Sequence, residues 1–326
     1  MKNNVIALRV RVQNVLMRTE EVIDWGLQSL GVSQLWRQTE GEGIKVAILD
    51  TGIDDRHPDL QSAIHDVKDF TNSPVGAFDR FGHGTHVAGI VAARANGFGV
   101  IGVAPQCKLM IGKVLADDGT GSAELVAKGM TWAVENGADI ISLSLGSPYP
   151  NEMLHDALIY AVSRSKIVVA AAGNYGAGYY IDTINYPARY EECISVGYID
   201  RNNVRSEYAS AGSRIDIMAP GEEVYSTYPM GLYAKLTGTS MATPFVAGVC
   251  ALCLSKHRSE IGGGTPCTNQ FEMRDHLRKT ATDLGDPGQD WFYGYGLINP
   301  EAILRNGKKR NEARGSAGVS FHTIAG

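Results

Sequence analysis

The sequence has little that would direct the chain out of a cell or into a membrane. The first residues, MKNNVIALRVRVQNVLM, contain no uninterrupted apolar run, because Arg9, Arg11, Gln13 and Asn14 break it. They therefore do not match a secretory signal. No stretch of the sequence is predicted to be long and apolar enough to span a membrane.

Cysteine is also scarce. The five cysteines form an odd set without zinc-ligand spacing: Cys107, Cys193, Cys250, Cys253 and Cys267. This usage favours reduced thiols and predicts a cytoplasmic location. Cys250 and Cys253 form a CxxC within an apolar helical stretch, where two small buried hydrophobic side chains are expected rather than a redox motif.

Charge of neither sign dominates the composition. A formal net charge of -5 in 326 residues gives no reason to expect a nucleic-acid partner. With 44% hydrophobic and 20% charged residues the composition is that of a globular protein. We predict one domain at residues 20–305, between a short leader at 1–19 and a polar, mobile tail at 306–326.

Alternating apolar runs predict the fold. Runs rich in Ile and Val are expected to form buried strands at residues 44–49, 109–115, 139–145 and 166–173. Helical spacing follows at 123–136, 152–163, 241–257 and 271–280, with a flexible loop expected at 262–264. The pattern predicts an α/β fold, a three-layer sandwich with a mainly parallel central sheet.

Three motifs carry candidate chemistry. Ser240 lies among small residues in GTSMATP, His83 opens HGTH, and Asp50 begins an Asp-Thr-Gly after an apolar strand. A serine hydroxyl needs a neighbouring base to act as a nucleophile, and the base needs a carboxylate to orient it. The order Asp, His, Ser and the absence of a G-x-S-x-G elbow argue against an α/β-hydrolase. Taken singly, each motif is also compatible with an ordinary turn.

Four segments together resemble a known family. DTGIDDRHPDL, FGHGTHVAG, VVAAAGN and GTSMATPFVAG are similar to the four hallmark segments of the subtilisin family of serine proteases, in the family's order, over about residues 25–304. The short leader makes the chain most similar to intracellular bacterial subtilisins. The resemblance implies that Asp50 orients the imidazole, His83 is general base and then acid, Ser240 is the nucleophile and Asn174 helps hold the oxyanion.

The resemblance also implies a substrate cleft. Residues 144–146 and 119–121 would pair with an extended peptide as flanking strands. The implied substrate-binding residues are Ser144, Leu145, Gly146, Gly119, Gly121, Gly173, Tyr175 and Asn185. The implied pocket for the substrate side chain before the cleaved bond is lined mostly by small residues. A broad preference for apolar or aromatic side chains is therefore expected, with Asn185 narrowing or polarising the floor of this pocket.

A calcium site is implied in the same way. The stretch 94–100 matches the length of the family's calcium loop. Side-chain oxygens are expected from Asp59, Asn96 and Glu21, and backbone carbonyls from Arg94, Phe98 and Val100. The alternative is an ordinary surface turn.

The leader and the expected partners bear on how the activity is regulated. Alternation of apolar and polar residues around Leu8 to Val12 suggests that the leader adds a strand along the cleft and blocks it, the alternative being a frayed terminus. Expected partners are peptides or unfolded proteins, and a homodimer follows from the family alone. A peptide-binding pseudoenzyme remains the rival function. His86 is expected in helix packing, and His57 and His65 at the surface.

Overall fold

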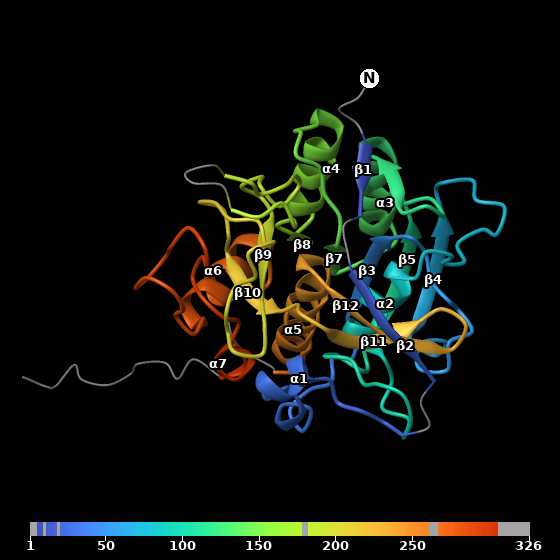
Figure 1. Cartoon of the computed structure of the whole chain (residues 1–326), viewed down its shortest axis with the longest axis horizontal. Coiled ribbons are helices and arrows are strands. Elements are labelled where there is room, and N and C mark those ends of the chain that lie inside the picture. The colour runs from blue at the N-terminus through green and yellow to red at the C-terminus, as the bar shows by residue number, and fades with distance from the viewer. Residues whose placement is uncertain (1–4, 9–10, 18–19, 178–181, 261–266, 306–326) are drawn as a thin grey trace, which may run out of the picture.

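A seven-stranded sheet forms the centre of the molecule (Figure 1). The computed structural model describes residues 5–8, 11–17, 20–177, 182–260 and 267–305, so the predictions for the loop at 262–264 and the tail at 306–326 lie outside the described residues. Neighbouring strands are parallel throughout, in the order β10 (Ile217–Pro220), β9 (Ile194–Ile199), β8 (Ile167–Ala171), β7 (Ile140–Leu143), β3 (Lys45–Asp50), β5 (Lys108–Lys113) and β4 (Ile64–Asp69).

Strand β3 shows how the sheet is covered on both faces. Val46 and Ile48 belong to one hydrophobic cluster, whereas Ala47 and Leu49 belong to the other, as the alternation of a strand requires. The first cluster includes side chains of α2 (His83–Ala92), α5 (Thr239–Ser259), α6 (Gln270–Thr280) and α7 (Pro300–Leu304), and the second includes those of α3 (Ala123–Glu135) and α4 (Glu152–Ser163). The predicted three-layer sandwich is therefore confirmed.

The predicted helices begin and end close to their expected residues. Ser122 accepts a hydrogen bond from the backbone N–H of Leu125 and so caps α3, and Asn151 caps α4 by accepting from Leu154. The prediction that no stretch is long and apolar enough to span a membrane was wrong, because helix α5 meets both the length and the composition criteria. However, 94% of its apolar window is buried inside the protein, so α5 serves as the central core helix.

A second, three-stranded sheet is formed by strands from distant parts of the chain. Strands β11 (Val224–Tyr228) and β12 (Leu232–Thr237) form an antiparallel hairpin, and β2 (Arg11–Leu16) from the leader adds to β12 as a third strand. A second leader strand, β1 (Val5–Ala7), pairs with β6 (Thr120–Ser122). The short elements α1 (Trp25–Ser29) and η2 (Val32–Gln34) complete the described fold.

The histidines outside the motifs are mostly structural. His86 is fully buried and its Nε2 lies 3.0 Å from the carbonyl oxygen of Ala234, which confirms the packing role. Burial lowers the pKa of His86 to about 3, so its ring stays neutral. The surface prediction for His57 was wrong, because its Nε2 donates to the carbonyl of Leu232 and its ring is buried. His65 is exposed.

The cysteines behave as core residues. All five are free and buried. Burial raises the pKa of Cys107 to about 12, which keeps that thiol protonated. Cys250 and Cys253 lie in the hydrophobic cluster around α5, as predicted for a packed pair.

Candidate active site

Three segments that are far apart in sequence bring the catalytic side chains together. Asp50 is the last residue of β3, His83 is the first residue of α2, and Ser240 is the second residue of α5. The Nδ1 of His83 lies 2.7 Å from Oδ1 of Asp50. Since Nδ1 donates to this carboxylate, Nε2 is left as the acceptor, which is the tautomer that a general base requires.

Ser240 is almost fully buried at the bottom of the cleft. Its hydroxyl donates to the carbonyl oxygen of Ser144 at 3.0 Å. Among the described residues, Nε2 of His83 has no hydrogen-bond partner. Rotation of the serine hydroxyl from Ser144 toward this nitrogen would place its proton on the base, and apo enzymes commonly hold their catalytic hydrogen bonds open in this way.

Pro244 helps to define the start of α5. A proline has no N–H, so it cannot donate to the carbonyl four residues earlier, which belongs to Ser240. The hydroxyl of Ser144 donates to that carbonyl instead, at 2.8 Å. This bond ties the first turn of α5 to the end of β7, and it fixes the backbone that carries the nucleophile.

Asp79 is a positioning residue that the sequence reasoning missed. This fully buried carboxylate accepts hydrogen bonds from Thr51 and Thr85 and from the backbone N–H groups of Phe81 and Gly82. It therefore joins the strand end that carries Asp50 to the first turn of the helix that carries His83. Its position, four residues before His83, was the only sequence signal for this role.

Asn174 lies beside the nucleophile. Its Oδ1 accepts from the backbone N–H of Thr239 at 3.0 Å and from the Thr239 hydroxyl at 3.2 Å. A Cβ on Gly238 would lie 2.8 Å from Nδ2 of Asn174, so glycine is required at that position. With its oxygen held in place, the amide can direct Nδ2 toward the developing oxyanion.

A small pocket lies next to Ser240. Six of the predicted residues line it: Ser144, Leu145, Gly146, Gly173, Tyr175 and Asn185. Ala171 and Thr239, which the sequence reasoning did not name, also line it. A Cβ on Gly173 would approach Nδ2 of Asn185 to 2.8 Å, so glycine lets the amide pack close to the pocket wall. Gly121 lies within β6 and Gly119 directly before it.

Carboxylates converge on the loop at residues 94–100. Asp59 accepts from the side-chain amide of Asn96 and the N–H of Val100, each at 3.0 Å. Glu21 accepts from the N–H of Asn96 at 2.9 Å. The guanidinium of Arg94 donates to neighbouring backbone carbonyls. In the described part of the chain, no cluster of three or more His, Cys, Asp or Glu side chains is suited to a metal ion.

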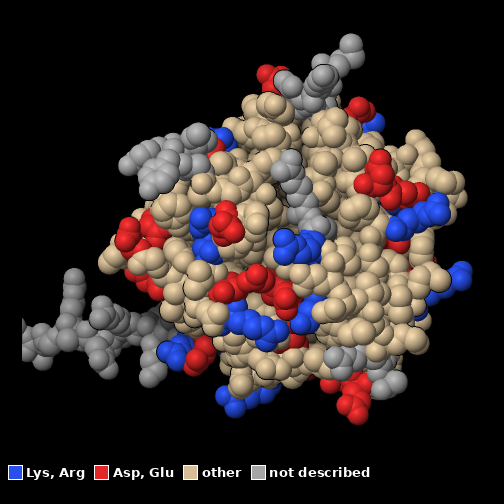
Figure 2. Space-filling view, in the orientation of Figure 1, with Lys and Arg blue, Asp and Glu red and all other residues tan. Residues whose placement is uncertain are grey.

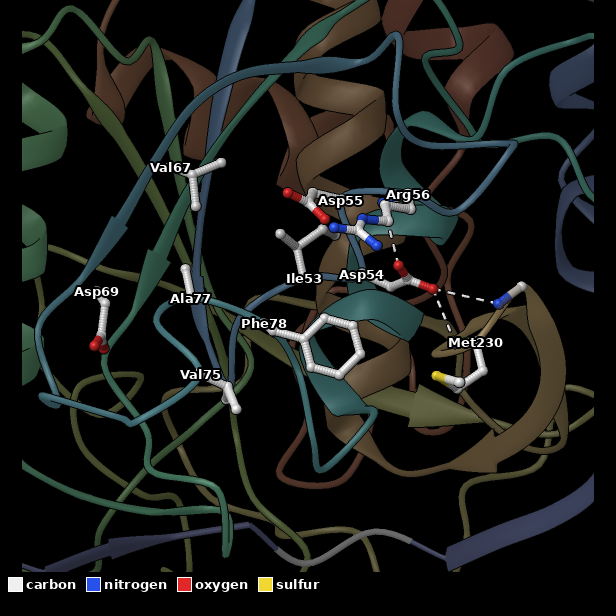
Figure 3. Close-up of a pocket in the computed structure, with 11 residues that line it drawn as sticks. Ile53, Asp54, Asp55, Arg56, Val67, Asp69, Val75, Ala77, Phe78 and Met230 are labelled. Atoms are coloured by element: carbon white, nitrogen blue, oxygen red, sulfur yellow. Dashed lines mark hydrogen bonds between the residues drawn. The ribbon is translucent and has the colours of Figure 1, made fainter.

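A larger hollow, of about 910 Å³, lies elsewhere (Figure 3). Val67, Val75 and Phe78 line it, but no triad residue does. Its central carboxylate, Asp54, accepts from the N–H groups of Met230 and Gly231, so it braces the β11–β12 turn. We therefore assign the chemistry to the smaller pocket beside Ser240.

A nucleophilic serine, a base oriented by a carboxylate and an amide donor, grouped at the ends of parallel strands, define a serine hydrolase of the triad type. The model of the Subtilase family matches residues 41–296. The chain belongs to this family of serine proteases and is a subtilisin-like endopeptidase.

Several named subtilisins are similar over most of their length. The chain is 45% identical to Subtilisin Savinase of Lederbergia lenta over 284 residues, covering 87% of this chain and 99% of that one. It is 42% identical to Subtilisin DY of Bacillus licheniformis over 286 residues, covering 87% and 100%. It is 45% identical to M-protease of Shouchella clausii (strain KSM-K16) over 284 residues, covering 87% and 70%.

The geometry accounts for peptide-bond hydrolysis. His83 takes the Ser240 proton as Oγ attacks the scissile carbonyl, and Asp50 stabilises the imidazolium that forms. Nδ2 of Asn174 and the backbone N–H of Ser240 are placed to stabilise the oxyanion. His83 then protonates the leaving amine, and water hydrolyses the acyl-enzyme with the same base.

Proposed function

We propose that this endopeptidase is held in a latent form by its own leader, which occupies the substrate cleft. The single observation that supports the proposal is the burial of Ile6, which is 1% exposed although it lies near the N-terminus. A frayed terminus would leave that side chain in water.

The leader follows the path expected of a substrate. Ile6 pairs with Gly121, and the N–H of Leu8 donates to the carbonyl of Gly119 at 3.4 Å. Ala7 and Leu8 line the same pocket as Ser240. Further along the leader, Arg11 pairs with Thr237, three residues before Ser240 in the sequence. The two described leader strands thus pair with two different strand edges, β6 and β12, and a substrate would compete for both edges.

Ile6→Ala in the full chain is expected to raise the initial rate of peptide cleavage by about thirtyfold or more. The Ile6 side chain belongs to the hydrophobic cluster that also includes Leu115, Ala123 and Leu145. Truncating a buried isoleucine costs about 2–5 kcal/mol, and this cost destabilises the state in which the leader occupies the cleft. The measurement is the initial rate with a short fluorogenic peptide. Val5→Ala is the matched control, because Val5 is 56% exposed on the same strand. Equal rates for wild type and Ile6→Ala would contradict the proposal.

The substrate is an extended polypeptide with an apolar or aromatic side chain before the cleaved bond. Small residues line the pocket beside Ser240, and Asn185 adds one amide, which favours broad acceptance of large side chains. The enzyme acts in the cytoplasm, a proposal supported by its five free thiols. A homodimer, proposed from the family likeness, is tested by light scattering of the full chain.

Calcium binds at the loop of residues 94–100. The donor chemistry fits the ion, because Asp59, Glu21 and the Asn96 amide offer hard oxygens around one loop. Neither carboxylate forms an ion pair with another described residue, so a cation would compensate their charge. Carbonyls of Arg94, Phe98 and Val100 would complete the shell. The bound ion would stabilise the loop without entering the reaction.

Chelation is therefore expected to lower the thermal unfolding midpoint. Calcium at about 100 times its Kd stabilises the native state by about 2.7 kcal/mol. Glu21→Ala is expected to raise the calcium concentration needed for half of this effect by about tenfold, because ligand charge sets affinity. Glu20→Ala, which removes a neighbouring exposed carboxylate, is the control. A midpoint that is insensitive to both calcium and chelator would exclude the site.

A further inference from the structure

An acidic hollow lies next to the catalytic centre. It has a volume of about 570 Å³, and its lining includes Asn174 and Thr237, three residues before Ser240. Three carboxylates also line it: Asp200, Glu207 and Glu222. The hollow therefore continues from the catalytic centre along the end of β12.

The three carboxylates give the hollow negative charge that a positively charged ligand group would compensate. Burial raises the pKa of Glu222, the charges of Asp200 and Glu223 raise it further, and the nearby charge of Arg11 opposes them. The side chains of Glu207 and Glu222 accept no hydrogen bond from the described residues, whereas Asp200 accepts from the N–H groups of Asn202 and Val204.

Besides Arg11 of the leader, Arg205 lines the hollow, and its guanidinium is already engaged. Arg205 donates to the carbonyls of Ser206 and Ala209, and its guanidinium lies 5.1 Å from the ring centre of Phe292. In the described structure it forms no ion pair with Glu207 or Glu222.

The leader shows what the hollow receives. Arg11, the first residue of β2, lines the hollow and brings its charge near Glu222. The sequence of residues 1–18 has four basic side chains and no acidic one, against a net charge of -5 for the whole chain. Figure 2 shows basic and acidic side chains meeting in the middle of this face. The charges of leader and hollow are complementary.

We propose that this hollow is a specificity subsite for an arginine or lysine side chain located one to three residues downstream of the cleaved bond. The range follows from the leader, because Leu8 lines the pocket beside Ser240 and Arg11, three residues later, lines the hollow and pairs with Thr237. This inference rests on the proposed function, in which the leader occupies the cleft as a substrate does. The subsite selects among polypeptides by charge, while the pocket beside Ser240 selects by size.

Cleavage-site profiling tests the subsite. The full chain is incubated with a peptide library of varied sequence, and mass spectrometry identifies the residues that follow each cleaved bond. Arginine and lysine are expected to be enriched about tenfold over glutamine at one position within the first three, as for a charge-assisted hydrogen bond at a partly exposed site. No such enrichment among the products of the full chain, neither in wild type nor with the leader weakened by Ile6→Ala, would overturn the proposal.

Variants separate the hollow from its surroundings. Glu222→Gln is expected to reduce the enrichment to about threefold or less without changing the preference before the cleaved bond. Glu223→Gln removes the same charge from a side chain that is paired with Lys235 at 3.1 Å, and it should keep the enrichment. Unchanged enrichment in Glu222→Gln, or equal loss in both variants, would count against the assignment of Glu222.

The Ile6→Ala chain is profiled alongside wild type. Its total rate reports on latency, whereas its residue profile reports on the hollow. An unchanged rate with basic enrichment would reject the leader as an inhibitor and keep the subsite. A raised rate without enrichment would keep the inhibitory leader and reject the subsite.

Discussion

Ser240→Ala should lower kcat by about a million-fold, the loss known for the same change in subtilisin itself. The variant keeps the cleft, because the carbonyl of residue 240 still accepts from Ser144, but it has no oxygen to form the acyl-enzyme. His83, oriented by Asp50, then has no serine proton to accept. Activity of about 10³–10⁴ over the uncatalysed reaction can remain from the oxyanion site and substrate binding.

The measurement combines turnover with intact mass after treatment with a serine-directed fluorophosphonate. Wild type should gain one adduct and Ser240→Ala none. Ser142→Ala is a matched control, since it removes another buried hydroxyl, one without a hydrogen-bond partner among the described residues. Labelling of Ser240→Ala would place the nucleophile elsewhere. If wild type and Ile6→Ala were both unlabelled and inactive, the triad would not be functional in this chain.

Asn174→Ala should lower kcat by about 10²–10³, again the range known for subtilisin itself, with little change in KM. The amide donates to the oxyanion only as charge develops, so its loss raises the barrier more than it weakens substrate binding. The check is the separation of kcat from KM with a peptide substrate in the leader-released Ile6→Ala background.

Asn174→Asp distinguishes catalysis from a structural effect. An aspartate keeps the oxygen that accepts from Thr239, but it lacks the Nδ2 donor and places negative charge near the oxyanion. It should therefore lose at least as much kcat as the alanine variant. Near wild-type turnover in Asn174→Asp would mean that Asn174 acts mainly by holding Thr239.

Local sequence predicted the sheet and its helices well. The runs that became β3, β5, β7 and β8 are apolar at almost every position, because both faces of a central parallel sheet are buried. The triad was also predictable, since each member lies in a short motif at the end of a strand or the start of a helix. Alternation in the leader indicated edge pairing, but it did not show that the leader forms two separate strands, one paired with β6 and the other with β12.

Tertiary structure alone decided the features that depend on distant contacts. Asp79 acquires its role from Thr51 and from the first turn of α2, and His57 is buried because Leu232 and Tyr233 cover it. The acidic hollow joins residues near 200 and 222 to Arg11 of the leader. Periodicity and short motifs report on neighbours along the chain, so sequence alone determined the elements and the triad. Burial and charge at these other sites arise from segments brought together by folding, which no local pattern encodes.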